Sequence, residues 1–285
     1  MNKFVKCLIA GGIIFAIGIV VLIIGLSLNG WTTDPEFTAE SWTQQESKIK
    51  SISIKFDAGE LETEYYDGDK IIVDYYVADV YKVTVNQNGD NLTIDTGFSR
   101  KFGWFGWWFN IKIPKMTVKL PMGTTYDLSV HLSAGTVKIA GGTFGKIDAR
   151  VSAGTLSFQG NTKCDNINID LSAGTVNIGN SECGSFKLDM SAGSANISNL
   201  TCSSLVVAVS AGSANITNIT CPKIDVKVSA GSANIGVIGA KSEYTLDVSK
   251  SAGNCNISSS TGSDPNKKVT VRLSAGSVTI NFSQS

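Results

Sequence analysis

The chain has 285 residues, of which 42% are hydrophobic and 17% charged, and its 24 basic side chains balance 24 acidic ones. This composition excludes an intrinsically disordered chain, which would be poor in apolar residues and carry excess charge. It also argues against a nucleic-acid partner, because nucleic-acid-binding proteins usually carry a basic surplus. The single histidine, His131, leaves little material for general acid–base catalysis.

The N-terminal segment predicts a membrane anchor. Residues 7–28 contain no charged side chain, and at 1.5 Å per residue a helix of this length spans about 33 Å, close to the hydrocarbon core of a bilayer. Lys3 and Lys6 precede the run, whereas Asp34 and Glu36 follow it. The positive-inside rule therefore places the N-terminus in the cytoplasm and the bulk of the chain outside the membrane.

A cleaved signal peptide is the alternative interpretation of this segment. Its apolar region would be about 7–15 residues long and would end at a small-x-small cleavage site, which residues 27–31 do not offer. We therefore expect a single-pass protein of the cell membrane. Its first segments are a cytoplasmic tail 1–6, a signal anchor 7–28 and a polar tether 29–47.

The next region, residues 48–125, predicts β-strands separated by turns at Gly68, Asn88-Gly89 and Pro121. The runs expected to form strands are Ile49–Phe56, Glu60–Tyr65, Lys70–Tyr76, Tyr81–Val85, Asn91–Asp95 and Met116–Leu120.

An aromatic cluster interrupts this region. Seven of the twelve residues 98–109 are aromatic, and basic side chains surround them. One interpretation is an exposed loop that inserts at the membrane interface or stacks on sugar rings. The other is a plug that covers the open end of the repeat array that follows. The candidate binding residues of the cluster are Trp104, Phe105, Trp107 and Trp108.

From residue 126 onward, the tripeptide Ser-Ala-Gly recurs eight times at steps of 19 to 23 residues. A near-constant period of this size indicates a stacked array of coils. The glycines of the tripeptide are the expected structural corners of the array: Gly135, Gly154, Gly174, Gly193, Gly212, Gly231, Gly253 and Gly276.

Apolar and polar side chains alternate on both sides of each corner glycine. Around Gly174 the apolar positions are Ile167, Ile169, Leu171, Val176 and Ile178. Alternation with a period of two predicts strands with one dry face. Its phase changes at the glycine, which tolerates the positive φ that a tight corner often needs. We therefore predict an all-β fold, a single-stack β-solenoid (a β-helix-like array) over residues 126–285, with about 19 residues per coil.

Two features depart from the regular repeat. Asp57-Ala58-Gly59 imitates the corner motif 76 residues before Gly135, which is four periods, so we expect the array to begin there in degenerate form. Lys250 stands in an otherwise apolar column where the period stretches to 22 residues. We expect a bulge or a loop in that coil.

Four cysteines follow the same period. Cys164, Cys183, Cys202 and Cys221 are each 19 residues apart, and Phe144 and Ala240 occupy the matching place in the flanking coils. These apolar substitutes favour thiols that face the core. Disulfide pairs are the second interpretation, because the outer side of a membrane permits them. A thiolate metal site is the third, although no CxxC motif and no nearby histidine accompany it.

An uncharged strip is expected on the outward side of the array. The asparagines three residues after the corner, Asn177, Asn196, Asn215 and Asn234, should stack on one another beside a row of small hydroxyl residues. Such a strip could bind a glycan or another sheet. The alternative interpretation is structural, with stacked amides that bond to one another along the array.

The repeat resembles a known family. Val118-Lys119-Leu120-Pro121, followed by Ser133-Ala134-Gly135-Thr136-Val137 and by later copies such as Leu171-Ser172-Ala173-Gly174-Thr175-Val176, resembles the bacterial putative-adhesin family of β-strand repeats. The resemblance covers about residues 48–285. It implies a β-helical surface domain, often tethered to the membrane, and it supplies no catalytic residues to transfer.

No sequence motif for nucleotide, metal or hydrolytic chemistry is present, and the charged outward column that includes His131 mixes both signs. We therefore expect no enzyme, cofactor or metal site, but a membrane-anchored, adhesin-like binding protein of the bacterial cell surface. Its partners would be the membrane and a cell-wall glycan or a surface or membrane protein. The alternative function is an extracytoplasmic sensor or scaffold in envelope-stress signalling.

Overall fold

The computed structural model describes residues 36–45, 48–98 and 115–283. The expected tail and anchor (1–28) and the candidate aromatic residues from Trp104 to Trp108 lie outside this part of the chain. Within it, no helix has the length and apolar character needed to cross a membrane. The described residues are all-β, with twenty strands and one short 3-10 helix at Lys241–Glu243.

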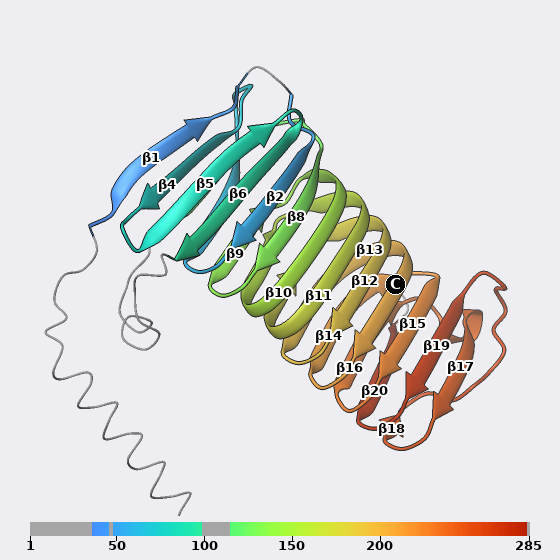
Figure 1. Cartoon of the computed structure of the whole chain (residues 1–285). Coiled ribbons are helices and arrows are strands. Elements are labelled where there is room, and N and C mark those ends of the chain that lie inside the picture. The colour runs from blue at the N-terminus through green and yellow to red at the C-terminus, as the bar shows by residue number, and fades with distance from the viewer. Residues whose placement is uncertain (1–35, 46–47, 99–114, 284–285) are drawn as a thin grey trace, which may run out of the picture. The chain divides into compact units, whose positions relative to one another are not determined.

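Each regular coil has an extended segment before and after its Ser-Ala-Gly corner (Figure 1), and in β10 (Thr143–Gln159) and β11 (Thr162–Ile178) one strand continues through the corner. In the preceding coil, β8 (Tyr126–Leu132) leads through Gly135 into β9 (Thr136–Ala140). Both pair in parallel with the next coil, Leu128 opposite Ile147 and Val137 opposite Leu156. The β-solenoid prediction is therefore confirmed for the described repeats. We call the sheet formed before the corners the first face and the sheet formed after them the second face.

The two faces run the length of the solenoid. The first face has the strand order β5-β6-β2-β8-β10-β11-β12-β13-β15-β19-β17, and the second has β1-β4-β7-β3-β9-β10-β11-β13-β14-β16-β20-β18. The strands not yet bounded are β1 (Thr38–Thr43), β2 (Ser51–Phe56), β3 (Glu60–Tyr66), β4 (Ile72–Val77), β5 (Tyr81–Asn88), β6 (Asn91–Phe98), β7 (Met116–Pro121), β12 (Ser181–Met190), β13 (Ser194–Val209), β14 (Ser213–Thr220), β15 (Lys223–Val228), β16 (Ser232–Ile238), β17 (Thr245–Lys250), β18 (Asn254–Cys255), β19 (Lys268–Leu273) and β20 (Ser277–Ser283).

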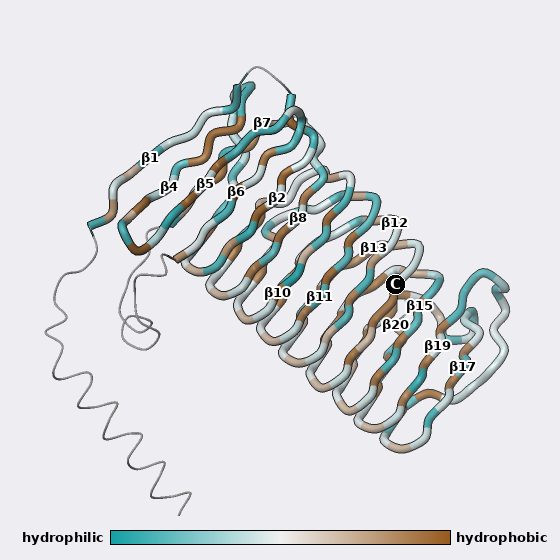
Figure 2. Tube along the Cα trace, in the orientation of Figure 1, coloured by the Kyte–Doolittle hydropathy of each residue, from teal (hydrophilic) through white to brown (hydrophobic). Residues whose placement is uncertain are grey.

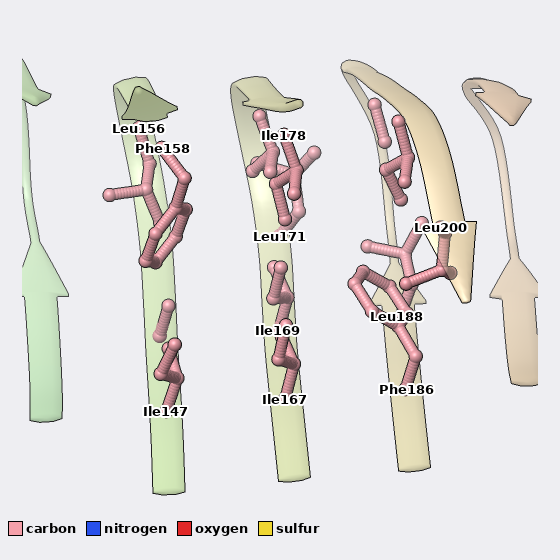
Figure 3. Close-up of a cluster of buried hydrophobic side chains, with 14 of the residues drawn as sticks. Ile147, Leu156, Phe158, Ile167, Ile169, Leu171, Ile178, Phe186, Leu188 and Leu200 are labelled. Atoms are coloured by element: carbon pink, nitrogen blue, oxygen red, sulfur yellow. The ribbon is translucent and has the colours of Figure 1, made fainter. Parts of the chain in front are cut away.

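A single hydrophobic core fills the space between the faces and extends from Ile49 to Ile280. Figure 2 shows the alternation of apolar and polar residues along the strands that this core requires. In Figure 3, Ile147, Ile167 and Phe186 from successive coils lie in one row. Fixing the backbone costs about 1–2 kcal/mol per residue, so one coil cannot fold alone and neighbouring coils must share the core.

The corner glycines are required mainly by the stacking of the coils. The φ angles are positive at five of the eight predicted corners, but not at Gly154, Gly212 or Gly231. A Cβ at Gly154 would lie 2.6 Å from the carbonyl oxygen of Gly135, and a Cβ at Gly212 would lie 2.7 Å from that of Gly193. All eight corners share this close approach. The positive φ expected from the sequence therefore explains only part of the requirement for glycine at the corners.

The N-terminal end corrects two expectations. The amide of Ala134 donates to the carbonyl of Asp57 at 2.8 Å, so the early corner motif lies one coil from Gly135 and not four. The residues between these two corners form additional strands at the N-terminal end of the stack. The chain reverses direction there, because β4 is antiparallel to β1 and β7, and β5 is antiparallel to β6. The polar tether prediction is wrong for residues 38–43, because β1 pairs with β4 and Trp42 packs against the core.

The coils at the C-terminal end do not follow sequence order. Strand β19 lies between β15 and β17, and β20 lies between β16 and β18. The coil that carries Lys250 is therefore the outermost one among the described residues, and Ser260 forms a β-bridge with Leu246 on its outer edge. This position explains the lysine in an apolar column, because Lys250 is exposed there. The expected irregularity exists, but its cause is a change in stacking order.

Candidate binding face

The second face is uncharged over most of its length. From β10 onward its outward rows consist of hydroxyl, amide and glycine residues, which are Thr155, Ser157, Gln159, Thr175, Asn177, Gly179, Ser194, Asn196, Ser198, Ser213, Asn215, Thr217, Ser232, Asn234, Gly236, Ser277 and Thr279. Apolar side chains at the alternate positions point into the core. This part of the face can therefore recognise a ligand only through neutral hydrogen bonds and shape.

The charges of the second face gather at its N-terminal end. Lys138 bonds Glu60 at 2.6 Å, and Lys115 bonds Glu62 at 2.8 Å. The bond from the Lys115 ammonium holds the pKa of Glu62 below its ordinary value, although burial opposes this effect. The lysine partners neutralise these two carboxylates, so the carboxylates exert no strong electric field on the amide-rich part of the face.

The asparagine row forms two short amide ladders. Asn196 Nδ2 donates to Asn177 Oδ1 at 3.1 Å, and Asn234 Nδ2 donates to Asn215 Oδ1 at 3.1 Å. Asn196 and Asn215 are in register, but within the described structure no hydrogen bond joins their side chains. The structural interpretation of the row is thus confirmed for two of its three steps. At the third step, between Asn196 and Asn215, the oxygen Asn196 Oδ1 and the nitrogen Asn215 Nδ2 are left available to hydrogen-bond a ligand.

A groove lies at this break. It has a volume of about 260 Å³, and Asn177, Asn196 and Asn215 line it, but Asn234 does not. Two residues farther along each coil, the lining continues with Gly179, Ser198 and Thr217. These side chains are small or absent, which leaves the surface hollow beside the amides.

A second amide ladder follows the groove residues directly. Asn180 donates to Asn161 at 3.1 Å, Asn199 to Asn180 at 2.7 Å and Asn218 to Asn199 at 3.0 Å. Asn199 and Asn218 have positive φ angles of 54° and 56°, which asparagine tolerates better than most residues. This ladder was not among the predicted features, although its four members, Asn161, Asn180, Asn199 and Asn218, are each 19 residues apart in the sequence.

The first face differs in being charged and internally paired. Arg272 bonds Asp225 at 2.8 Å, and Arg150 lies 3.6 Å from Asp170. His131 is exposed in the same outward column. Oppositely charged neighbours of this kind form a solvated surface and not a pair of facing carboxylic acids.

The cysteine column is buried in the solenoid wall. Cys164, Cys183, Cys202 and Cys221 are free and buried, and Phe144 pairs with Cys164 as expected. The neighbouring Cys183 thiol, together with burial, raises the pKa of the Cys164 and Cys202 thiols. The Cys164 and Cys202 thiols beside it lower the pKa of Cys183.

The core-thiol prediction is confirmed for these four residues, and the structure contains no disulfide among them. The expected place of Ala240 is wrong. The 19-residue register is lost before it, because Ile219 pairs with Val237, and Ala240 caps the 3-10 helix at Lys241–Glu243. The hydroxyl of Tyr244 donates to the carbonyl of Cys221 at 3.1 Å.

The described residues on either side of the aromatic cluster lie close to the start of the β unit. The ring of Tyr81 is 5.3 Å from that of Phe98, where the chain leaves β6, and 6.5 Å from that of Phe37, which precedes β1. Strand β7 resumes on the second face opposite β3. The chain therefore leaves the first face at the end of β6 and enters the second face at β7, the same change of face that a regular coil makes at its Ser-Ala-Gly corner.

The fold and the face together define a parallel β-solenoid with a neutral, amide-rich surface. A family model described as Toastrack DUF4097 matches residues 49–283, so the chain belongs to this family. The resemblance inferred from the repeats is thereby confirmed at the level of a putative-adhesin family.

Two solved structures are similar to this chain over nearly their whole length. A putative adhesin from Bacteroides fragilis NCTC 9343 has 13% identity and a TM-score of 0.52, and the match covers 86% of this chain and 98% of that one. A putative adhesin from Parabacteroides distasonis ATCC 8503 has the same identity and TM-score, with 88% and 98% covered. At this identity the likeness shows the fold alone. A search of the curated proteins found no match.

Proposed function

We propose that the chain is a non-catalytic, adhesin-like binding protein of the bacterial cell surface. Residues 7–28 would anchor it in the cell membrane, and the solenoid would be displayed outside. The observation that carries this proposal is the neutral second face, on which unpaired amide groups border a groove. Two similar structures bear the name putative adhesin, which is consistent with such a role.

The arrangement favours binding over chemistry. Polysaccharide hydrolysis needs two carboxyl groups that face each other across a bond. The carboxylates described above are instead held in ion pairs on an exposed face or at one end of the solenoid. A long face with one repeating set of neutral hydrogen-bonding groups suits a cell-wall glycan or the surface of another protein.

The proposal is tested with the full-length chain in its own membrane. Protease treatment of intact cells should release peptides from residues 37–283 and leave the N-terminal segment with the cells. The purified full-length chain in detergent micelles should then sediment with isolated cell walls or with whole cells. A chain that resists the protease until the cells are lysed, or that sediments with neither, would contradict the proposal.

A sensor or scaffold of envelope-stress signalling is the second candidate. The contacts of Phe37 and Phe98 with Tyr81 favour it, because Phe37 follows the proposed membrane segment in the chain and Phe98 begins the aromatic cluster. The cluster could then contact a membrane partner. Crosslinking in intact cells should capture a membrane protein that is lost when Trp104 and Trp107 are both changed to alanine. Capture of the same proteins by wild type and variant would exclude this role.

A further inference from the structure

We propose that the groove beside Asn177, Asn196 and Asn215 is a subsite for a neutral oligosaccharide chain that lies along the solenoid axis. This inference rests on the proposed binding function and names the ligand class of the same face. Three features of the face support it: the break in the asparagine row, the small residues of the groove and the absence of charge on the groove lining.

The break in the amide row supplies a matched donor and acceptor. Asn177 and Asn215 use their Oδ1 atoms as acceptors within their own short ladders. Asn196 Oδ1 and Asn215 Nδ2 have no such partner in the described structure, although the two residues are neighbours in register. A sugar hydroxyl both donates and accepts, so adjacent hydroxyls on one ring can satisfy both groups.

The small groove residues add polar groups without filling the space. Gly179 has no side chain, and Ser198 and Thr217 present hydroxyls in the same outward row. Ile178 and Ile197 also line the groove while remaining buried. The groove therefore combines a polar rim with apolar surface beneath it, which is the composition expected of a site for a sugar ring with polar edges and apolar faces.

The electrostatics and the repeat select the ligand class. The groove lining carries no ionisable side chain, so it offers no counter-charge to a phosphate, a sulfate or an acidic peptide. The same positions recur in each coil at about 4.8 Å. A polymer of similar neutral units can use successive coils, whereas a compact ligand would use only one.

A pair of glycine variants tests the groove without disturbing the fold. A Cβ at Gly179 would find only the carbonyl oxygen of Phe158 within 4.0 Å, so Gly179→Leu should fill the groove without strain. The matched control is Gly236→Leu, in the same row but outside the groove, where the nearest atom is Asn218 N at 3.5 Å. Neither glycine has a positive φ.

The probes are hexamers of β-1,4-linked N-acetylglucosamine and of glucose, titrated into the full-length chain in detergent micelles by calorimetry. Wild type and Gly236→Leu should bind one of them equally well. Gly179→Leu and the double variant Asn196→Ala/Asn215→Ala should each lose about tenfold or more in affinity. Asn168→Ala, on the first face, should bind as wild type does.

Two results would overturn the inference, and both are distinguishable from failure of the proposed function. Binding of an oligosaccharide that Gly179→Leu does not weaken would move the site elsewhere and leave the proposed function intact. Failure of wild type to bind either hexamer up to about 10 mM, while it still sediments with cells, would exclude a neutral glycan as the occupant. Failure to sediment as well would contradict the proposed function itself.

Discussion

Gly276 stacks directly on Gly231, although Gly253 lies between them in the sequence. The amide of Ser277 donates to the Gly231 carbonyl at 3.0 Å, and the amide of Asn254 donates to the Gly276 carbonyl at 2.9 Å. The last coil of the chain is therefore inserted between the coil of Gly231 and the coil of Gly253. The final strands β19 and β20 are thus covered on both sides, and the more polar coil becomes the end of the stack.

The stacking order can be tested by exchanging two residues of one column. Leu273 is 3% exposed and pairs with Lys250, which is exposed at the end of the stack. Leu273→Lys should cost about 4 kcal/mol or more, because it buries an unpaired charge. Lys250→Leu should change the free energy of unfolding by about 0.5 kcal/mol or less. Denaturant unfolding measures both. A small cost of Leu273→Lys together with clear stabilisation by Lys250→Leu would mean that the coils follow sequence order.

The corner column makes a second prediction. Gly212 has no positive φ, and a Cβ there would lie 2.7 Å from the Gly193 carbonyl oxygen. Gly212→Ala should therefore destabilise the solenoid by about 1–3 kcal/mol through overpacking. Gly236→Ala, which meets its nearest atom at 3.5 Å, serves as the control and should be neutral or slightly stabilising. If both variants unfold at the same denaturant concentration, axial stacking does not explain the column.

The regular part of the fold could be predicted because every coil repeats the same local sequence pattern. Apolar residues on alternate positions change phase at a glycine, and the 19-residue period places Cys164 beside Cys183. The ends could not be predicted this way. Whether Gly253 or Gly276 stacks next on Gly231 depends on which of their coils better tolerates solvent at the end of the stack, and no local pattern encodes that comparison.

The candidate site was predicted only in part for a similar reason. The asparagine row is visible in the sequence, but the groove exists because Gly179, Ser198 and Thr217 are small beside it. The break between Asn196 and Asn215 depends on which way each amide turns, and equal spacing in the sequence gives no sign of it.

The cysteine ladder predicts a graded pattern of alkylation. Cys255 is only partly buried in the outermost coil, whereas the other four described cysteines are buried. Under native conditions iodoacetamide should modify Cys255 well before those four, because alkylation requires an accessible thiolate. Peptide-level mass spectrometry separates the sites, and prior unfolding in denaturant should equalise them. Intact mass before and after reduction provides the control for disulfides. Early modification of Cys183 in the folded protein would contradict this order.

The ion pair at the edge of the second face predicts a pH dependence. Asp74 accepts a hydrogen bond from the Ser41 hydroxyl at 2.7 Å and pairs with Lys119 at 2.9 Å, and both interactions lower its pKa below the ordinary value of 3.8. The unfolded chain therefore binds this proton more readily than the folded one, so the stabilisation is complete above pH 3.8 and is lost as the pH falls through the folded pKa. Asp74→Asn should cost about 0.2–1 kcal/mol near pH 7, the range of an exposed pair.

That cost should shrink to nothing in strong acid, where wild type and variant carry the same charge at this position. Thermal unfolding from pH 7 to pH 2 measures the difference. Asp95→Asn, a change at an exposed carboxylate that no ion pair holds in the described part of the chain, is the control and should track wild type throughout. A cost of Asp74→Asn that stays constant down to pH 2 would show that the negative charge of Asp74 does not contribute to the stability of this edge.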